Sequence, residues 1–322
     1  MSGTWGNNLK ITIFGESHGE AVGAAVCGLP AGMTVDFDFI SNELLRRAGG
    51  RDRFSTSRRE SDEFKFVSGV FEGKLTGAPV CCIIPNADTR SADYHKIKNL
   101  MRPSHADYTA FVKYGGHNDY RGGGHFSGRI TAALVAAGAL CKLFLMQKGI
   151  TVESKLLTED LENKILQAKS EKDSVGGKVE VAICGVKAGV GSPFFDSVES
   201  ILSHLFFSIP GVKGVEFGAG FALTDMKGSM ANDEFYAENG KVYTKTNNSG
   251  GINGGITNGM PIVARLAFRP TTSIAKEQST IDISTMTNVK IEVKGRHDPC
   301  IARRGAIVAE SAAAIGIAEL IV

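Results

Sequence analysis

The 322-residue sequence lacks the excess charge that would direct a protein to a highly charged partner. Its 36 Lys and Arg residues are balanced by 34 Asp and Glu residues, which gives a formal net charge of +2. The charge of the whole molecule therefore attracts neither nucleic acid nor a membrane surface. Any affinity for anions has to come from local clusters of basic residues.

Signals for export or membrane insertion are also missing. The first ten residues contain no basic segment followed by an apolar one, as a signal peptide would. The Ala-rich run near residues 130–146 looks too short and too interrupted to span a bilayer. We therefore expect a cytoplasmic protein with no membrane partner.

Metal-site, redox and low-complexity patterns are missing as well. The six cysteines include no Cys-x-x-Cys pair, so no metal site is expected and the thiols are predicted to be buried and reduced. The 39 glycines follow no period, which excludes collagen-like and low-complexity chains. What the sequence does contain is 43% hydrophobic residues, enough for a sizeable core, and glycines that indicate many tight turns.

Three consecutive glycines lie between two arginines in the stretch Arg121–Arg129, which leads into an apolar, Ala-rich run from Ile130. Glycine lets the backbone approach a ligand closely, and the free N–H groups of a helix N-terminus attract anions. The pattern predicts an anion site at the start of a buried helix. Glycines that serve only turn geometry explain the local pattern about equally well.

Two histidines lie in tight polar turns. His18 follows an alternating, strand-like segment, residues 9–14, within Gly15–Glu20, and His105 lies within Arg102–Tyr108. An imidazole can exchange a proton near neutral pH. A lone histidine in a turn is more often structural, but two of them in glycine- or proline-bounded turns favour a catalytic role.

The most charged segment, residues 46–59, has six arginines, no lysine and a Gly-Gly pair. Forked guanidinium groups suit phosphate or carboxylate, so the pattern favours anion binding. The alternative is a solvated loop whose arginines pair with Glu60 and Asp62. RNA binding is a further alternative, although the segment has no aromatic residue besides Phe54 for base stacking.

Three later loops add polar groups at strand ends. Residues 247–259 are rich in Gly and Asn, Arg269–Ser273 places hydroxyl groups beside a cation, and Lys294–Pro299 gathers basic residues around one acid. The second of these would suit a phosphate, although Ser and Thr turns are also ordinary in loops.

Hydrophobic periodicity predicts sheet followed by helix in both halves of the chain, without a residue-level repeat that proves duplication. Residues 151–177 are predicted to be a solvent-facing excursion with one amphipathic helix. The expected strands cover residues 9–14, 22–27, 64–71, 80–84, 178–186, 212–218, 262–268 and 289–293, and the expected helices cover 37–47, 130–145, 157–169, 194–207 and the chain from about 305.

Six motifs, in order along the chain, resemble those of the chorismate synthase family. The resemblance runs from about residue 5 to about residue 315. A single motif would be weak, whereas six collinear ones leave little room for chance. The motifs are Gly15–Gly19, Arg102–Asp107, Arg121–Gly124 with Ser127 and Arg129, Gly250–Gly259, Arg269–Ile274 and Gly295–Pro299.

The resemblance implies an α/β fold of the α+β type, the β-α-β-α sandwich of this family. Residues 1–322 would form a single large catalytic domain with pseudo-duplicated sheet and helix halves, usually assembled as a homotetramer. The implied reaction is a trans-1,4-elimination of phosphate from 5-enolpyruvylshikimate 3-phosphate, which gives chorismate in the shikimate pathway of aromatic amino acid biosynthesis. The enzyme would be a carbon–oxygen lyase that uses reduced FMN without net redox change, with NADPH or an external flavin reductase as the source of electrons.

The resemblance also assigns roles to residues that match the family's motifs. His105 would protonate the flavin and His18 the leaving phosphate, with Ser17 and Ser127 as proton relays. Asp298 would work with flavin N5 in removing the ring proton. The residues implied to bind the cofactor are His125, Phe126, Ser127, Pro210, Gly211, Gly254, Arg269, Pro270, Thr271, Thr272, Ser273, Arg296, Arg47 and Arg53. Those implied to bind the substrate are Arg47, Arg53, Arg102, Arg129 and Arg296, of which the first two also match the family's NADPH-associated arginines.

The sequence departs from the family's usual pattern at several positions. His125 and Phe126 replace an Arg followed by Ser or Ala, Arg269 replaces a lysine, and Ser104 replaces a glycine. The segment after Ser154 and the C-terminus are shorter than usual.

Two alternatives from other classes are a non-catalytic binding protein for an anionic metabolite and an RNA-binding protein that uses the 46–59 arginines. The first has no need for both histidines and Asp298. The second predicts an affinity that falls steeply with salt and no flavin.

Overall fold

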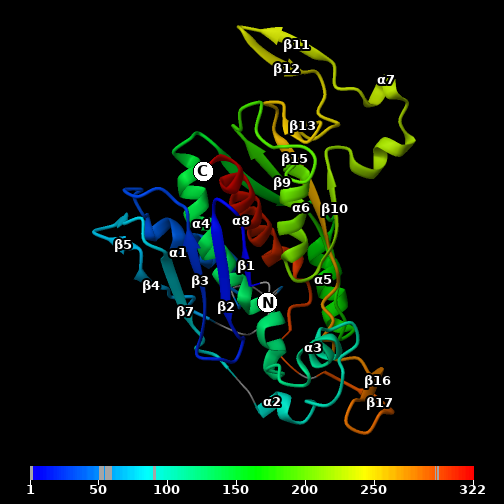
Figure 1. Cartoon of the computed structure of the whole chain (residues 1–322). Coiled ribbons are helices and arrows are strands. Elements are labelled where there is room, and N and C mark those ends of the chain that lie inside the picture. Colours follow the sequence, from blue (N-terminus) through cyan, green and yellow to red (C-terminus); the bar gives the residue numbers. More distant parts are fainter. Residues whose placement is uncertain (1–2, 51–53, 55–59, 90–91, 294, 296) are drawn as a thin grey trace.

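The computed structural model describes residues 3–50, 54, 60–89, 92–293, 295 and 297–322. Two antiparallel sheets enclose a set of helices (Figure 1). The first sheet has the strand order β1 (Thr4–Trp5), β2 (Lys10–Gly15), β3 (Ala21–Cys27), β7 (Val80–Pro85) and β4 (Lys65–Ser68). The second has the order β10 (Val212–Phe217), β15 (Ile262–Phe268), β9 (Gly177–Cys184) and β8 (Thr151–Leu156).

Four helices fill the space between the sheets. α4 (Thr131–Met146) packs on β3 and β7 of the first sheet, and α8 (Ala302–Ile321) packs on β8 and β9 of the second. α1 (Phe37–Arg47) contacts both of these helices, and α6 (Val198–Ser208) packs on α8 and β10. Each sheet therefore has its own helices, in agreement with the expected sheet and helix halves.

Small side chains let the two central helices approach each other closely. α4 and α8 are rich in alanine, and most of their residues are buried. A Cβ added at Gly138 of α4 would lie 2.3 Å from the Cβ of Ser311 of α8, a distance that side chains do not tolerate. Gly138 is therefore required where the two helices cross.

The remaining elements are short and lie at the ends and edges of this core. The hairpin β11–β12 and α7 project from the body of the chain at the top of Figure 1. These elements are β5 (Val70–Phe71), β6 (Lys74–Leu75), α2 (Ala92–His95), α3 (Asp107–Tyr114), η1 (Arg121–Phe126), η2 (Gly128–Ile130), α5 (Leu161–Ser170), η3 (Gly220–Asp225), α7 (Gly228–Ala231), β11 (Phe235–Glu238), β12 (Lys241–Thr244), β13 (Ile252–Asn253), β14 (Ile256–Thr257), β16 (Gln278–Asp282) and β17 (Thr287–Ile291).

The expectation of a solvent-facing excursion at residues 151–177 was wrong. Thr151–Leu156 is an edge strand of the second sheet that pairs with β9 from Thr151↔Cys184 to Leu156↔Val179. α5 buries Leu161, Ile165 and Ala168 against the core. Edge strands often carry polar residues, and the polar residues of this strand made it difficult to predict from the sequence.

Three helix boundaries also differ from expectation, and the first is that of α5, which begins at Leu161 rather than near residue 157. α6 begins at Val198 rather than near residue 194, because Ser197 caps it by accepting a hydrogen bond from the Ser200 N–H. Phe194 and Phe195 precede the cap and are 88% and 89% exposed. The last helix begins at Ala302, slightly before the expected residue 305.

The cysteines are all free, as expected, but they are not all buried. Cys82, Cys141 and Cys300 are buried, whereas Cys184 is exposed at the end of β9. The Ala-rich run also differs from expectation, because Gly128–Met146 is long and apolar enough to cross a membrane by length and composition. It is 94% buried inside the protein, which is the environment of a core helix.

Candidate active site

The triple-glycine loop packs directly against both candidate histidines. Gly122, Gly123 and Gly124 have φ angles of 60°, 89° and 53°, in the left-handed region that favours glycine. A Cβ on Gly122 would lie 2.3 Å from Cε1 of His18, and one on Gly123 would lie 3.1 Å from Cε1 of His105. The loop thus brings together two histidines that are far apart in the sequence.

His18 lies in a rigid turn just beyond β2. Ser17 is fully buried and His18 is 8% exposed, and the Ser17 hydroxyl lies 3.2 Å from Nδ1 of His18 in a hydrogen bond. The Asn86 side chain donates to the carbonyls of Glu16 and Gly19, both at 2.9 Å, and so closes the turn. The arrangement lets Ser17 exchange a proton with the imidazole.

His105 is held by a carboxylate. Its Nδ1 lies 2.8 Å from Oδ1 of Asp107, the first residue of α3. Asp107 also accepts from Nε and Nη2 of Arg102, each at 2.7 Å. Burial opposes ionisation of Asp107, but the bonds from His105 and Arg102 outweigh it and hold the pKa of Asp107 well below its usual range. An ionised carboxylate at this distance places a proton on Nδ1 and leaves Nε2 for chemistry.

A second buried carboxylate joins two of the predicted substrate arginines. Asp62 pairs with Nη2 of Arg47 at 2.8 Å and with Nη1 of Arg129. Arg47 is 1% and Arg129 5% exposed. Arg129 also donates from Nε to the Asn86 side chain at 2.8 Å and from Nη2 to the Pro85 carbonyl at 3.0 Å. The guanidinium of Arg129 is therefore fixed on the side of the turn that carries His18.

The pKa shifts of Asp62 and Arg47 follow from burial and from the charges around them. Burial alone raises the pKa of Asp62, but Arg47 and Arg129 outweigh it and keep that pKa below its usual range. Burial, and then the charge of Arg304, lower the pKa of Arg47 to about 10. Asp62 and Arg47 are therefore both charged at neutral pH.

Many of the sequence-predicted residues line one cavity of about 890 Å³. This volume falls in the range of cofactor and ligand sites. Apolar residues of β2 and α4, including Ile11, Ile13 and Leu134, line part of it. The predicted residues among its lining are His105, His125, Phe126, Pro210, Gly211, Arg269, Pro270, Thr271, Thr272 and Asp298.

The other predicted residues that the structure describes lie outside that lining, and they are Ser17, His18, Arg47, Arg102, Ser127, Arg129, Gly254 and Ser273. Ser127 accepts a hydrogen bond from the Arg129 N–H, and Ser273 lies 3.5 Å from Nη1 of Arg102. Gly254 lies in the turn between β13 and β14, and a Cβ there would meet no atom within 4 Å. Arg53 and Arg296 lie outside the described residues.

The comparison with known proteins decides the family. The family model described as chorismate synthase matches residues 9–158 and 155–322. The chain belongs to the chorismate synthase family. The two matched pieces overlap at residues 155–158.

Curated chorismate synthases match along nearly the whole chain. The one from Thermococcus gammatolerans is 46% identical over 342 residues, covering 98% of this chain and 96% of the relative. The one from Chitinophaga pinensis is 47% identical, covering 98% and 95%. A solved structure titled "Crystal Structure of Chorismate Synthase" matches with a TM-score of 0.77 at 27% identity, covering 98% of this chain and 92% of that one. The expected α/β fold of the chorismate synthase type is confirmed.

The chorismate synthase fold also places polar residues in the site that the motifs did not reveal. Arg304 lines the large cavity, and its Nη1 lies 2.5 Å from Oδ2 of Asp298. Lys213, from β10, lines the same cavity. Two arginines in the first turn of a helix are unfavourable next to the helix dipole, and this was the available signal for Arg304.

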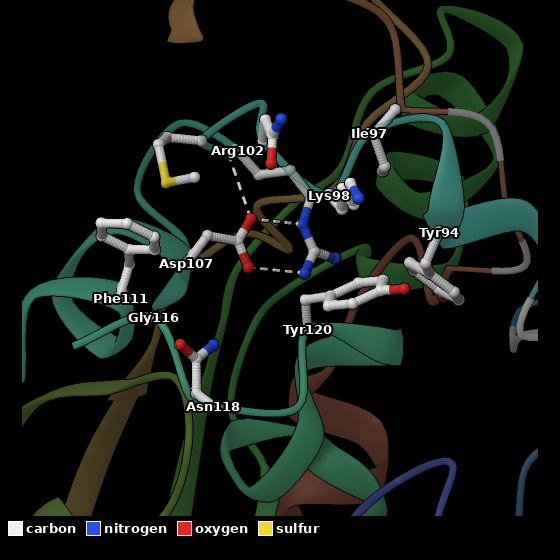
Figure 2. Close-up of a pocket in the computed structure, with 11 residues that line it drawn as sticks. Tyr94, Ile97, Lys98, Arg102, Asp107, Phe111, Gly116, Asn118 and Tyr120 are labelled. Carbon is white, nitrogen blue, oxygen red and sulfur yellow. Dashed lines mark hydrogen bonds and ion pairs between the residues drawn. The ribbon is translucent and has the colours of Figure 1, made fainter. Parts of the chain in front are cut away.

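A smaller cavity of about 260 Å³ adjoins Arg102. Figure 2 shows the Arg102 guanidinium facing the Asp107 carboxylate, with the rings of Tyr94 and Tyr120 beside it. The Tyr94 ring lies 5.8 Å from the Arg102 guanidinium and 5.1 Å from the His18 ring. Tyr94 thus connects the two histidine turns.

His297, next to Asp298, is a neutral histidine. Burial, and then the positive charges of Arg102 and His105, lower the pKa of His297 to about 4.

In the part of the chain that the structure describes, no group of three or more His, Cys, Asp or Glu residues could hold a metal ion.

Proposed function

We propose that this chain eliminates phosphate from 5-enolpyruvylshikimate 3-phosphate in a trans-1,4 sense and gives chorismate, as a carbon–oxygen lyase of the shikimate pathway. Membership of the chorismate synthase family supports the proposal. The single structural observation that supports it most is the packing of His18 and His105 against one glycine loop beside the cavity that Asp298 lines. Neither the metabolite-binding nor the RNA-binding alternative requires that arrangement.

The large cavity suits a reduced FMN cofactor. Phe126, Pro210 and Pro270 offer flat apolar faces, and Arg269 and Thr271 offer a cation and a hydroxyl for a phosphate. A Cβ on Gly211 would lie 2.4 Å from Cδ1 of Ile301, so only glycine leaves this part of the wall open. Reduced FMN supplies an electron-rich ring that assists loss of the phosphate.

The protein's own groups would move the protons. His105, with Nδ1 protonated toward Asp107, presents Nε2 to the flavin side of the site, where it donates a proton. His18 would donate a proton to the leaving phosphate, and Ser17, 3.2 Å from its Nδ1, would act as a relay that gives one proton to the imidazole and takes up another in return. Ser127 serves as a second relay, and Asp298 accepts the ring proton together with the flavin.

Buried arginines would bind a substrate that has one phosphate and two carboxylates. Arg47 and Arg129 share Asp62, which leaves one net positive charge between them. Nε of Arg47 is buried and has no hydrogen-bond partner among the described residues, so a donor remains for an anion. Arg102 is the third described cation of this set, and Arg53 and Arg296 are assigned to substrate by their motifs alone.

The remaining assignments are also proposals. Residues 1–322 form a single catalytic domain, in which α4 on the first sheet and α8 on the second pack against each other. The chain works in the cytoplasm as a homotetramer, and exposed aromatic residues on projecting segments, such as Phe195 at 89% and Phe221 at 79%, favour such an assembly. NADPH, bound near Arg47 and Arg53, or an external flavin reductase supplies the electrons.

Phosphate release under anaerobic conditions tests the function. The protein is mixed with reduced FMN and 5-enolpyruvylshikimate 3-phosphate, and inorganic phosphate is measured with time. Multiple turnovers are expected. An intact, folded protein that releases no phosphate would contradict the proposal, and salt-steep retention of RNA would then favour the RNA-binding alternative.

A further inference from the structure

Arg304 lies where a cation is unfavourable. It belongs to the first turn of α8, which begins at Ala302 and has no acidic residue in that turn. The N-terminus of a helix carries a partial positive charge, so an arginine there needs compensation from outside the helix. The contacts of its side chain show where that compensation comes from.

Two groups hold the Arg304 guanidinium. Its Nη1 lies 2.5 Å from Oδ2 of Asp298, and its Nε donates to the carbonyl of Arg47 at 2.8 Å. Arg47 is the last residue of α1, so that carbonyl lies at the negative end of a helix. The guanidinium thus connects the end of α1 to the carboxylate of Asp298.

The backbone around Asp298 is fixed from the opposite side. The Thr271 hydroxyl donates to the Asp298 carbonyl at 2.6 Å, and the Val175 N–H donates to the Pro299 carbonyl at 2.9 Å. These two hydrogen bonds hold the main chain at Asp298 and Pro299, and the Arg304 guanidinium holds the Asp298 carboxylate. Asp298 and Arg304 line the same cavity, with 10% and 25% of their side chains exposed.

We propose that Arg304 is a positioning residue that holds the Asp298 carboxylate in one orientation at the wall of the cavity. The inference rests on the proposed function, in which Asp298 accepts the ring proton. A charged hydrogen bond from an arginine is short and directional, and a fixed acceptor loses less entropy when the proton is transferred. Arg304 acts through Asp298, and other residues provide the affinity for substrate.

Substitution of Arg304 tests this role against a matched control on the same turn. Arg304→Ala is expected to lower kcat by about 10-fold or more, because a misplaced Asp298 loses part of the rate enhancement that a general base provides. The KM for substrate and the Kd for FMN should each change by less than about twofold. Arg304→Lys should restore part of kcat, since an ammonium can still pair with the carboxylate. Arg303→Ala should resemble the wild type, because Arg303 contacts Glu162 at 3.4 Å and the Phe54 ring at 4.9 Å.

A crystal structure of Arg304→Ala provides a readout that does not depend on turnover. The Asp298 side chain is expected to leave its wild-type torsion angles while the backbone at Thr271 and Pro299 stays in place. An unchanged carboxylate, an unchanged kcat, or a loss of FMN affinity with normal kcat at saturating FMN would each overturn the positioning role. Wild-type protein without phosphate release would refute the proposed function instead, and the crystal structure would still decide the role of Arg304. If the alanine variant does not fold, the same measurements are made on Arg304→Lys. An unchanged kcat together with unchanged Asp298 geometry in that variant would contradict the positioning role.

Discussion

Asp62→Asn should destabilise the protein strongly, because Asp62 is the carboxylate that neutralises two buried guanidinium groups. Each charged hydrogen bond of this kind contributes about 1.5–3 kcal/mol, and breaking a buried ion pair costs about 3–5 kcal/mol. Asn keeps the shape and one acceptor oxygen but leaves Arg47 and Arg129, 1% and 5% exposed, without their counter-charge. We therefore expect a loss of about 3 kcal/mol or more in the free energy of unfolding.

Urea unfolding followed by circular dichroism measures this loss. Glu234→Gln is the matched control, since Glu234 pairs with Lys245 on the exposed β11–β12 hairpin, and it should leave the midpoint unchanged. A difference of less than about 1 kcal/mol between Asp62→Asn and the wild type would refute the reasoning.

The pH dependence of stability gives a second check on Asp62. The pKa of Asp62 is lowered in the folded protein, so its contribution is present above its ordinary pKa, near pH 4, and is lost as the pH falls toward the folded-state pKa. The difference in stability between wild type and Asp62→Asn should therefore shrink below about pH 4. A constant difference across that range would mean that the charge of Asp62 is not the cause.

Other substitutions test the catalytic groups. His18→Ala and His105→Ala should each lower turnover by about 10²-fold or more, as loss of a positioned proton donor does; near-normal rates in both would refute their roles. Asp107→Asn should lower kcat by about 10-fold or more because Nδ1 of His105 loses its ionised acceptor, and full activity would show that the 2.8 Å contact has no catalytic role. Gly122→Ala should reduce activity because its Cβ would lie 2.3 Å from the His18 ring, whereas Gly128→Ala, with no atom within 4 Å, should not; equal effects on turnover would contradict the packing account.

The sequence predicted both histidine turns and the glycine loop because each carries a local signal. Glycines at tight turns and histidines at strand ends are visible without knowing the fold. The contact of the loop with His18 was not visible, because it joins segments that are about one hundred residues apart. At this loop the turn-geometry alternative is confirmed by the positive φ angles of the glycines, which also pack against the imidazoles, while close approach to a ligand stays a prediction.

Charged residues were harder to assign than glycines. The segment 46–59 was predicted to bind anions, with pairing to Asp62 as the alternative, and the structure pairs Arg47 with Asp62 in a buried site. Burial of a charge depends on tertiary packing, which the local sequence does not reveal. Arg304 escaped prediction for the same reason, because its partner Asp298 belongs to the preceding loop. β8 was missed because its alternating pattern is interrupted by charged residues on the open side of an edge strand.

The stoichiometry of one anaerobic reaction tests the central claim most directly. Reduced FMN, 5-enolpyruvylshikimate 3-phosphate and the protein are mixed without oxygen, and phosphate, chorismate and the flavin spectrum are followed together. We predict equal amounts of phosphate and chorismate over many turnovers, with the flavin still reduced at the end. Absence of both products, or phosphate release accompanied by equivalent oxidation of the flavin, would contradict the account.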